Sequence, residues 1–171
     1  MVKKVVVYAD TFSGYCHLVP LINESVPEIM RAFKSIWACI PPPERILLDN
    51  ATYFIALKQM RPKLSEKLVH RELDMHFVTP YLHRSNPAER LNRSILERMK
   101  TECLYDGEFR KKSWLDVVSD CQSWLNNSVK QVEKVSAMEI HFHPSKISDK
   151  RSVVEEHHLK YLKETVGEKY E

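Results

Sequence analysis

Two acidic residues stand where carboxylates often do chemistry, at the end of a strand and at the start of a helix. Asp49 ends the apolar run RILLD at residues 45–49, and Glu89 opens the helical pattern in SNPAERLNRSI at residues 85–95. Carboxylate oxygens are hard ligands that suit Mg²⁺ or Mn²⁺. Two such ions about 4 Å apart can stabilise the attacking and the leaving oxygen of a phosphodiester displacement. The pair therefore predicts a site for metal-dependent phosphoryl transfer.

Each acid also has a local explanation. Asn86, Pro87 and Glu89 fit the N-cap, first and third positions of a capping box, where the helix dipole also favours a carboxylate. Glu89 and Arg93 form an ordinary i,i+4 pair on a solvated face. Asp49 could form an Asx turn that leaves the strand. The residues alone leave the metal site and these local roles open.

The elements that would position the two acids alternate between strands and helices. Apolar periodicity and turn residues predict strands over 4–9, 15–21, 45–49 and 73–78, and helices over 26–39, 55–72 (irregular), from Asn86 onward, and 113–128. The first two strands form a hairpin around the turn DTFSG. This order predicts an α/β or α+β fold with a mixed β-sheet. Residues 147–171 form a charged C-terminal tail that could contain one short helix.

The predicted helices carry caps and apolar stripes. Ser25 and Glu28 have the spacing of a capping box around Pro27. In the helix that begins near Asn86, one face carries Leu91, Ile95 and Met99, and another carries Glu89, Arg93, Glu97 and Lys100. In the helix over 113–128, the inward residues are predicted to be Trp114, Val117, Val118, Cys121, Trp124 and Leu125.

Composition narrows the classes of protein to which the chain can belong. The 171 residues have a net charge of only +3, so a nucleic-acid-binding surface would have to be local. The 3 glycines exclude a glycine-rich phosphate loop. The four cysteines form no CxxC pair, which favours free thiols in a reducing compartment. No stretch has the length of a membrane span or a signal-peptide core, so we expect an intracellular protein, nuclear or cytoplasmic and not secreted.

Four segments together resemble the catalytic core of retroviral and LTR-retrotransposon integrases, which are acidic-triad polynucleotidyl transferases with an RNase H-like fold. These segments are VVVYADTFSGYCHLVPL (5–21), LLDNATYF (47–54), VTPYLHRSNPAERLNRSI (78–95) and KVSAMEIHFHPSK (134–146). They resemble, in order, the family's hairpin with its Asp-x-Phe-Ser turn, its second catalytic Asp, its catalytic Glu and its Ser-Pro-Phe-Glu-Leu element. The resemblance implies an RNase H-like α/β fold, a mixed β-sheet flanked by α-helices, over residues 1–146, and a role in DNA integration.

The resemblance also assigns roles to single residues. It implies that Asp49 and Glu89 are catalytic residues and ligands of a two-metal Mg²⁺ or Mn²⁺ site, and that DNA is the partner of a homo-oligomer that is not attached to a membrane. It further implies a DNA-binding set composed of Arg90, Arg93, Lys100, Tyr81, Arg84 and Asn50.

The sequence departs from the family pattern at its first catalytic acid. The family carries this Asp on a strand before the hairpin, and this chain begins with the hairpin, so the first strand is expected to be missing. Asp10 aligns with the family's turn Asp, and a turn is a sufficient reason for an Asp there. Two carboxylates hold a metal pair poorly. We therefore expect weak or absent catalysis, or alternatively a domesticated or decayed integrase fragment that acts as a non-catalytic DNA- or protein-binding module.

Overall fold

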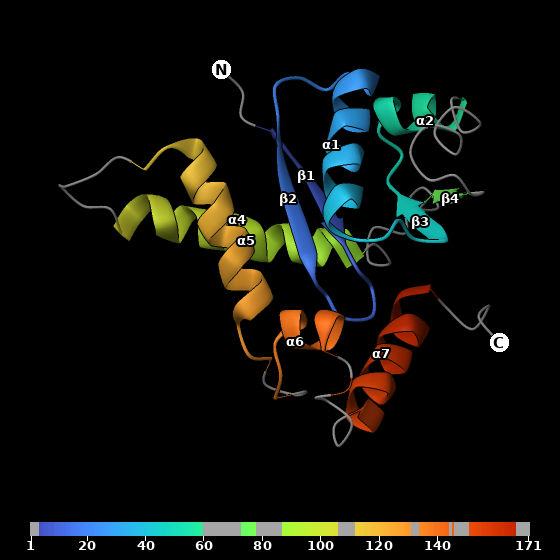
Figure 1. Ribbon diagram of the computed structural model, residues 1–171, viewed down its shortest axis with the longest axis vertical. Coiled ribbons are helices and arrows are strands. Elements are labelled where there is room, and N and C mark those ends of the chain that lie inside the picture. Colours follow the sequence, from blue (N-terminus) through green and yellow to red (C-terminus); the bar gives the residue numbers. More distant parts are fainter. Residues whose placement is uncertain are drawn as a thin grey trace. The chain divides into compact units, whose positions relative to one another are not determined.

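The computed structural model describes residues 4–59, 73–77, 87–105, 112–130, 134–143, 145 and 151–166, without the side chains of 87–90, 102–105, 151, 157 and 161–166. The elements are β1 (Lys4–Ala9), β2 (Cys16–Leu21), α1 (Val26–Cys39), β3 (Arg45–Leu48), α2 (Thr52–Gln59), β4 (Asp74–Phe77), α4 (Pro87–Tyr105), α5 (Trp114–Asn127), α6 (Ala137–Phe142) and α7 (Arg151–Val166) (Figure 1). The chain divides into one unit of Met1–Val6 and Val19–Asn86 and another of Val7–Leu18 and Pro87–Glu171.

Strands β1 and β2 pair as the predicted hairpin. The Gly14 N–H donates to the Asp10 carbonyl at 2.8 Å, and the Asp10 N–H donates to the Tyr15 carbonyl at 2.8 Å. Gly14 has a φ of +72°, so this end of the hairpin is a G1 bulge, in which two residues oppose one. At the bulge, Asp10 lies opposite both Gly14 and Tyr15.

In the first unit, helix α1 has the bounds that its sequence predicts, because Pro27 opens it and residues 41–43 (PPP) follow it. Its buried stripe forms much of this unit's core, and Phe33 stacks on Trp37 and on Phe54 of α2. Helix α2 begins at Thr52, earlier than predicted, and residues 60–72 of the predicted irregular helix lie outside the described residues.

The predicted capping box at the start of α1 is wrong. The Ser25 side chain makes no cap hydrogen bond. The Glu28 carboxylate instead accepts the Ile22 N–H at 3.0 Å and two hydrogen bonds from Arg31, at 2.8 and 3.0 Å. Arg31, one turn later, therefore binds the carboxylate that the capping box would have used. The hydrogen bonds from Arg31 and from the Ile22 N–H lower the pKa of Glu28 to about 2.

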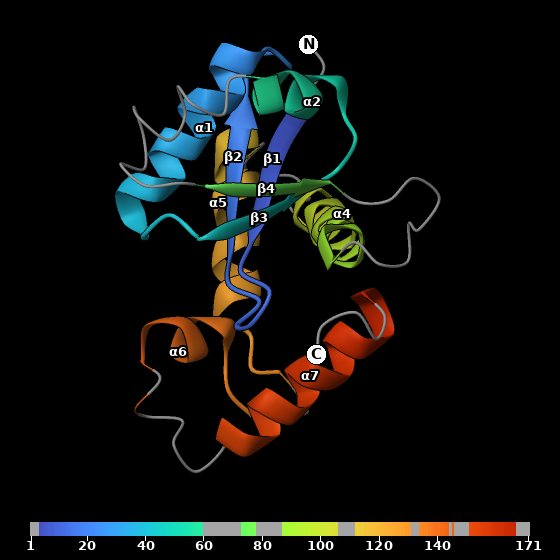
Figure 2. The same ribbon diagram turned by 90° about the vertical axis from the view of Figure 1, so that its right-hand side faces the viewer.

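Strands β3 and β4 form a second pair, which is parallel and in the register Arg45↔Asp74 to Leu48↔Phe77 (Figure 2). Ile46, Leu48 and Met75 are buried, and Leu73, just before β4, is fully buried. The predicted α/β class is confirmed. Antiparallel and parallel pairs both occur, and within the described residues they belong to two separate two-stranded sheets.

In the second unit, α4 packs on α5 through the predicted apolar stripes. Ile95, Met99 and Cys121 are buried at this contact, and the Cys121 thiol lies 3.8 Å from the Ile95 carbonyl. Trp124 was predicted to point inward, and this prediction is wrong, because the residue is 44% exposed. The Arg98 guanidinium lies over its ring, 4.9 Å from the centroid. None of the described helices is long and apolar enough to cross a membrane.

The end of the chain adds α6, which was not predicted, and α7. Helix α6 begins with a capping box in which the Ser136 and Glu139 side chains accept from each other's backbone N–H. Helix α7 is the helix expected in the tail, and its Val154 is buried in a cluster with Val135 and Ile140. The ring of Phe12, in the turn after β1, contacts His158 of α7 edge-on at 5.2 Å.

Candidate functional site

Asp49 follows the last residue of β3, and its side chain is exposed. The Ala51 N–H donates to Asp49 Oδ1 at 3.0 Å, so the Asx turn weighed from the sequence does form. The turn uses one oxygen and holds the carboxylate at the carboxyl end of the strand. Burial raises the pKa of the nearby Tyr53 hydroxyl, and the negative charges of Asp49 and Glu24 add to this effect. Asn50, the neighbour in the predicted DNA-binding set, is also exposed.

Glu89 lies in the first turn of α4, which begins at Pro87. This places Glu89 at the third helical position, which the capping box requires, and at the start of a helix, where the metal interpretation expects it. The side chains of Glu89 and Arg90 lie outside the described part of the structure. Asp49 belongs to the first unit and Glu89 to the second, so the convergence of the two carboxylates stays a prediction.

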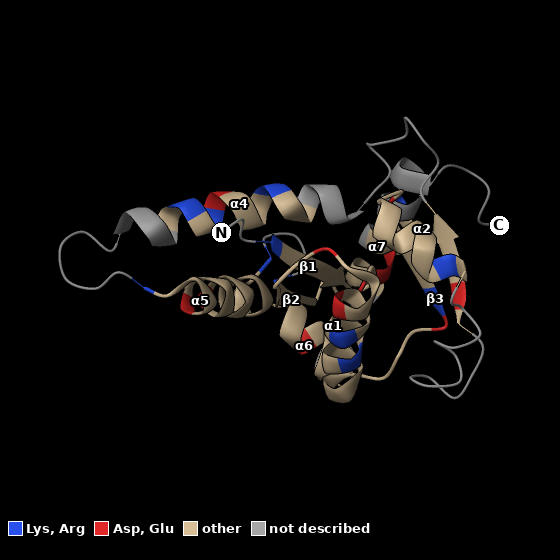
Figure 3. Ribbon diagram, turned by 90° about the horizontal axis from the view of Figure 1, so that it is seen from above, with Lys and Arg blue, Asp and Glu red and all other residues tan. Residues whose placement is uncertain are grey.

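Arg93 and Lys100 both project into solvent from α4, as predicted. Their spacing of seven residues places them on one face of the helix, with the exposed Glu97 between them. Figure 3 shows Lys and Arg recurring along the described part of α4. A stripe of this kind can follow a line of phosphates, although the acid in its middle reduces its positive potential. Tyr81 and Arg84, the other predicted DNA contacts, lie outside the described residues.

A metal centre is not assembled among the described side chains, because no group of three or more His, Cys, Asp or Glu residues there could hold an ion. Asp49 suits a hard cation, since it is an exposed carboxylate with one oxygen outside its turn. The fit of a metal therefore rests on one described donor and on the predicted approach of Glu89.

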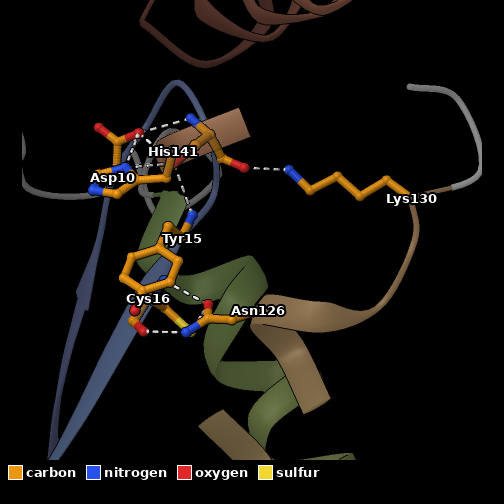
Figure 4. A network of polar contacts seen from close by, with 7 residues as sticks. Asp10, Tyr15, Cys16, Asn126, Lys130 and His141 are labelled. Atoms are coloured by element: carbon orange, nitrogen blue, oxygen red, sulfur yellow. Dashed lines mark hydrogen bonds and ion pairs between the residues drawn. The ribbon is translucent and has the colours of Figure 1, made fainter. Parts of the chain in front are cut away.

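A polar network that the sequence did not predict joins the hairpin tip to α5 and α6 (Figure 4). Asp10 Oδ2 accepts from the Ser13 N–H at 2.7 Å and from the Ser13 hydroxyl at 2.5 Å, which confirms Asp10 as a turn residue. His141 Nδ1 lies 3.2 Å from Ser13 Oγ and 3.6 Å from Asp10 Oδ2. Lys130 donates to the Ser13 carbonyl at 2.6 Å, so α6 and the segment after α5 both hold the tip.

The combination of Ser13, His141 and Asp10 has the residue types of a hydrolytic triad but not its geometry. Ser13 is fully buried, and its hydroxyl lies within 2.5 Å of the carboxylate instead of approaching a substrate. In a working triad the histidine would stand between the serine and the acid. The His141 ring also stacks on Tyr15, with centroids 4.7 Å apart. The network is therefore a structural clamp.

The thiols in this region are not reactive groups. Cys16 and Cys121 are fully buried free cysteines, and Cys39 in the first unit is free and exposed. Burial, together with the neighbouring Cys121, raises the pKa of Cys16 to about 12, so its thiolate is scarce near neutral pH. The prediction of free thiols is confirmed for these three cysteines.

No protein-family model matches the chain, and no curated protein matches it in sequence. Solved structures do match. The catalytic core domain of HTLV-2 integrase, solved with magnesium, superposes with a TM-score of 0.60 at 18% identity, over 81% of this chain and 93% of that one. The catalytic core domain of BIV integrase gives 0.63 at 17% identity, over 84% and 88%.

A larger assembly matches as well. A chain of the simian T-cell lymphotropic virus intasome, solved in complex with a PP2A regulatory subunit, gives a TM-score of 0.65 at 16% identity over 83% of this chain. This chain spans 53% of that chain, or about half of its length. At these identities the likeness is one of fold, and it is the fold that the four sequence segments imply. The chain has the fold of retroviral integrase catalytic cores.

Proposed function

We propose that this protein is an integrase-core-like protein of retroelement origin that binds nucleic acid and holds a divalent ion with Asp49 and Glu89. The observation that carries the proposal is the position of the two acids in this fold. Asp49 stands exposed at the carboxyl end of β3, and Glu89 stands in the first turn of α4. Two of the four segments that resemble the integrase family, 47–54 and 78–95, imply that the same two positions are metal ligands.

In the proposed site, the Asx turn holds Asp49 Oδ1 against the Ala51 N–H, which leaves Oδ2 to face the ion. Glu89 would supply a second carboxylate oxygen. The HTLV-2 integrase core, which has the same fold, was solved with magnesium, and this supports Mg²⁺ or Mn²⁺ as the ion. A bound ion of this type would stabilise negative charge on the oxygens of a phosphodiester.

Arg93 and Lys100 would contact phosphates along the exposed face of α4, and Arg90, one turn before Arg93, would extend the same stripe. Guanidinium groups suit this task because they can bind two phosphate oxygens at once. These contacts position a duplex without reading its sequence.

We expect weak or absent strand transfer from this chain. Two carboxylates compensate the charge of a metal pair incompletely, and no third acid joins Asp49 among the described side chains. The exposed Trp124 favours the second candidate function, a non-catalytic binding module. An exposed tryptophan with an arginine on its ring is the kind of residue pair that anchors protein partners.

Metal binding is tested by thermal unfolding with and without Mn²⁺. The wild type should gain about 1.4 kcal/mol of stability at tenfold the dissociation constant. Asp49→Asn keeps an oxygen for the Ala51 N–H and removes the charge, so it should fold normally and lose most of the gain, as should Glu89→Gln. Glu97→Gln, also on α4, is the matched control. Equal stabilisation of all four proteins would contradict the assignment.

Catalysis is tested on a labelled DNA duplex with Mn²⁺. We expect little nicking or strand transfer. Robust product that disappears in both Asp49→Asn and Glu89→Gln would show that the chain is an active enzyme. DNA affinity that falls with salt and is unaffected by Mn²⁺ and by both substitutions would favour the binding module.

A further inference from the structure

Four aromatic rings meet where the hairpin tip contacts α6, and we call them the Tyr15 cluster. Tyr15 is buried, and its ring stacks on His141 of α6 with the centroids 4.7 Å apart (Figure 4). Phe142 of α6 contacts the Tyr15 ring edge-on at 5.0 Å. His17, two residues after Tyr15 and on the same face of β2, contacts it edge-on at 5.3 Å. One buried ring therefore touches two histidines, one from the hairpin and one from α6.

His17 lacks the partner that a protonated imidazole requires. Its Nε2 atom is buried, and no hydrogen-bond partner reaches that atom among the described residues. An imidazolium carries an N–H on both ring nitrogens, so a proton taken up by His17 would create a buried, charged donor without an acceptor. Burial accordingly lowers the pKa of His17, and the nearby His141 lowers it further. The closed cluster therefore favours the neutral form of His17.

His141 has an anionic neighbour instead. Its Nδ1 atom lies 3.6 Å from Asp10 Oδ2 and 3.2 Å from Ser13 Oγ. A carboxylate at this distance stabilises an imidazolium, so His141 accepts a proton more readily than His17 does. The positive charge on His141 then opposes a second positive charge on His17. Lys130, whose ammonium donates to the Ser13 carbonyl, is a further cation at the tip and has the same sign.

The contacts that hold β2 on α5 do not depend on pH. The Asn126 carboxamide accepts the Cys16 N–H at 2.9 Å and donates to the Cys16 carbonyl at 2.8 Å. Gln122, one turn earlier on α5, accepts the Leu18 N–H at 2.7 Å. Neither carboxamide titrates. Helix α6 instead holds the tip through a titratable ring, that of His141. Protonation can therefore release α6 while β2 stays on α5.

We propose that the Tyr15 cluster is an acid-sensitive latch, which is closed at neutral pH and releases α6 from the hairpin tip when His17 and His141 both carry a proton. Two imidazoliums against one buried ring repel each other, and the departure of α6 allows water to reach both. Ile140 of α6 is buried in a cluster with Val154 of α7, so the two helices move together. The latch uses neither metal nor DNA, so it stands independently of the proposed function.

The sign of the pH dependence follows from His17. Its pKa is lower in the closed latch than the ordinary value of 6.5, so the open latch takes up a proton at a higher pH than the closed one. The closed latch is fully stable above pH 6.5 and loses stability as the pH falls through the pKa of His17 in the closed form. Local openings of this kind precede unfolding of a whole unit when only part of the contact surface is weakened.

The first test is an NMR titration of the isotope-labelled protein from about pH 7.5 to about pH 5, across the usual range of histidine. The nuclear Overhauser contact between the Tyr15 and Phe142 rings reports the closed latch. The ratio of closed to open protein should fall by up to about tenfold per pH unit for each proton taken up on opening. The Cys16 amide should stay protected from exchange, because Asn126 still binds it. Loss of both signals together, or a ring contact that persists to pH 5, would overturn the proposal.

The second test assigns the opening to the two histidines of the cluster. His17→Phe keeps a ring against Tyr15 and cannot take up a proton, so its latch should stay closed in acid. His158→Gln is the control, because His158 of α7 contacts Phe12 of the turn, and it should open as the wild type does.

A third variant keeps the test decisive even if His17→Phe fails to fold. Asp10→Asn retains an oxygen for the Ser13 N–H but removes the charge that stabilises an imidazolium at His141. Its closed latch therefore tolerates protons less well, and it should open at a higher pH than the wild type. Opening of His17→Phe at the wild-type pH, or opening of Asp10→Asn at no higher pH, would overturn the proposal.

Discussion

Asn126 of α5 binds Cys16 of β2 as a neighbouring strand would, because its carboxamide accepts the Cys16 N–H and donates to the Cys16 carbonyl. Both residues are buried, at 2% and 0% exposure. One helix side chain thus replaces the two hydrogen bonds that a strand residue would supply. This contact connects positions 110 residues apart and fixes the hairpin on α5.

We predict that Asn126→Leu destabilises the protein by about 2–4 kcal/mol. The leucine fills a similar volume but leaves a buried N–H and a buried C=O without partners, and each unsatisfied group costs about 1–3 kcal/mol. Asn127→Ala is the control, since Asn127 is exposed and donates to the Ser123 carbonyl of its own helix. The measurement is the free energy of unfolding in urea. A loss no larger than that of the control would mean that water readily replaces the carboxamide.

Gly14→Ala should destabilise the hairpin tip by about 1–2 kcal/mol. The φ angle is +72° at this position, and a residue with a Cβ adopts this left-handed conformation only at a steric cost. The added Cβ would also lie 2.7 Å from Lys130 Nζ, which donates to the Ser13 carbonyl. A double-mutant cycle with Lys130→Met separates the two effects. If the backbone penalty dominates, the cost persists in the Lys130→Met background. If the clash with Lys130 dominates, the cost largely disappears there.

The sequence predicted those elements whose boundaries depend on local chemistry. Helix α1 was predicted to its first and last residues because prolines bound it, and Asp10 was predicted as a turn residue because the turn is local. The wrong predictions concern a carboxylate for which two partners compete and a contact between residues far apart along the chain. Glu28, the expected capping partner of Ser25, binds Arg31 instead, and Trp124 is exposed and contacts Arg98 of another helix.

In the candidate site, too, the local features could be predicted and the contacts between distant residues could not. The Asx turn at Asp49 and the position of Glu89 at the start of α4 follow from neighbouring residues, and both could be predicted. The clamp formed by Ser13 and His141 joins residues 128 positions apart, and no spacing rule connects them. Helix α6 is six residues long, too short for its apolar periodicity to be distinguished from that of a loop.

Acidification should weaken the second unit through His17. Burial lowers the pKa of His17 below 6.5, and the nearby His141 lowers it further. The unfolded chain therefore takes up a proton at a higher pH than the folded one. Stability is complete above pH 6.5 and falls as the pH drops through the folded pKa. His17→Gln should flatten this part of the profile, whereas His143→Gln, at an exposed position, should not. Unfolding curves measured at a series of pH values test this.

Glu28 should make a separate contribution at lower pH. Arg31 and the Ile22 N–H lower the pKa of Glu28 from 4.5 to about 2. The folded state then favours the carboxylate, so this stability is present above pH 4.5 and is lost as the pH falls toward 2. Glu28→Gln should lower stability at neutral pH and reduce the slope of acid unfolding in this window. Arg31→Met should have the same effect on the slope. A slope that neither substitution changes would assign acid unfolding to other carboxylates.

Arg93 and Lys100 provide the most direct test of nucleic-acid binding. Each residue that neutralises one phosphate contributes about 1 to the slope of log affinity against log salt concentration, since binding releases counterions. We expect Arg93→Ala and Lys100→Ala each to weaken DNA binding and to reduce this slope by about 1, roughly equally for DNA of any sequence. Lys160→Ala, which removes one exposed positive charge from α7, is the matched control. Glu97→Gln should strengthen binding, because it removes the negative charge between the two cations. If Lys160→Ala weakened affinity as much as Arg93→Ala and Lys100→Ala do, the effect would come from net charge, and the stripe on α4 would not be the contact surface.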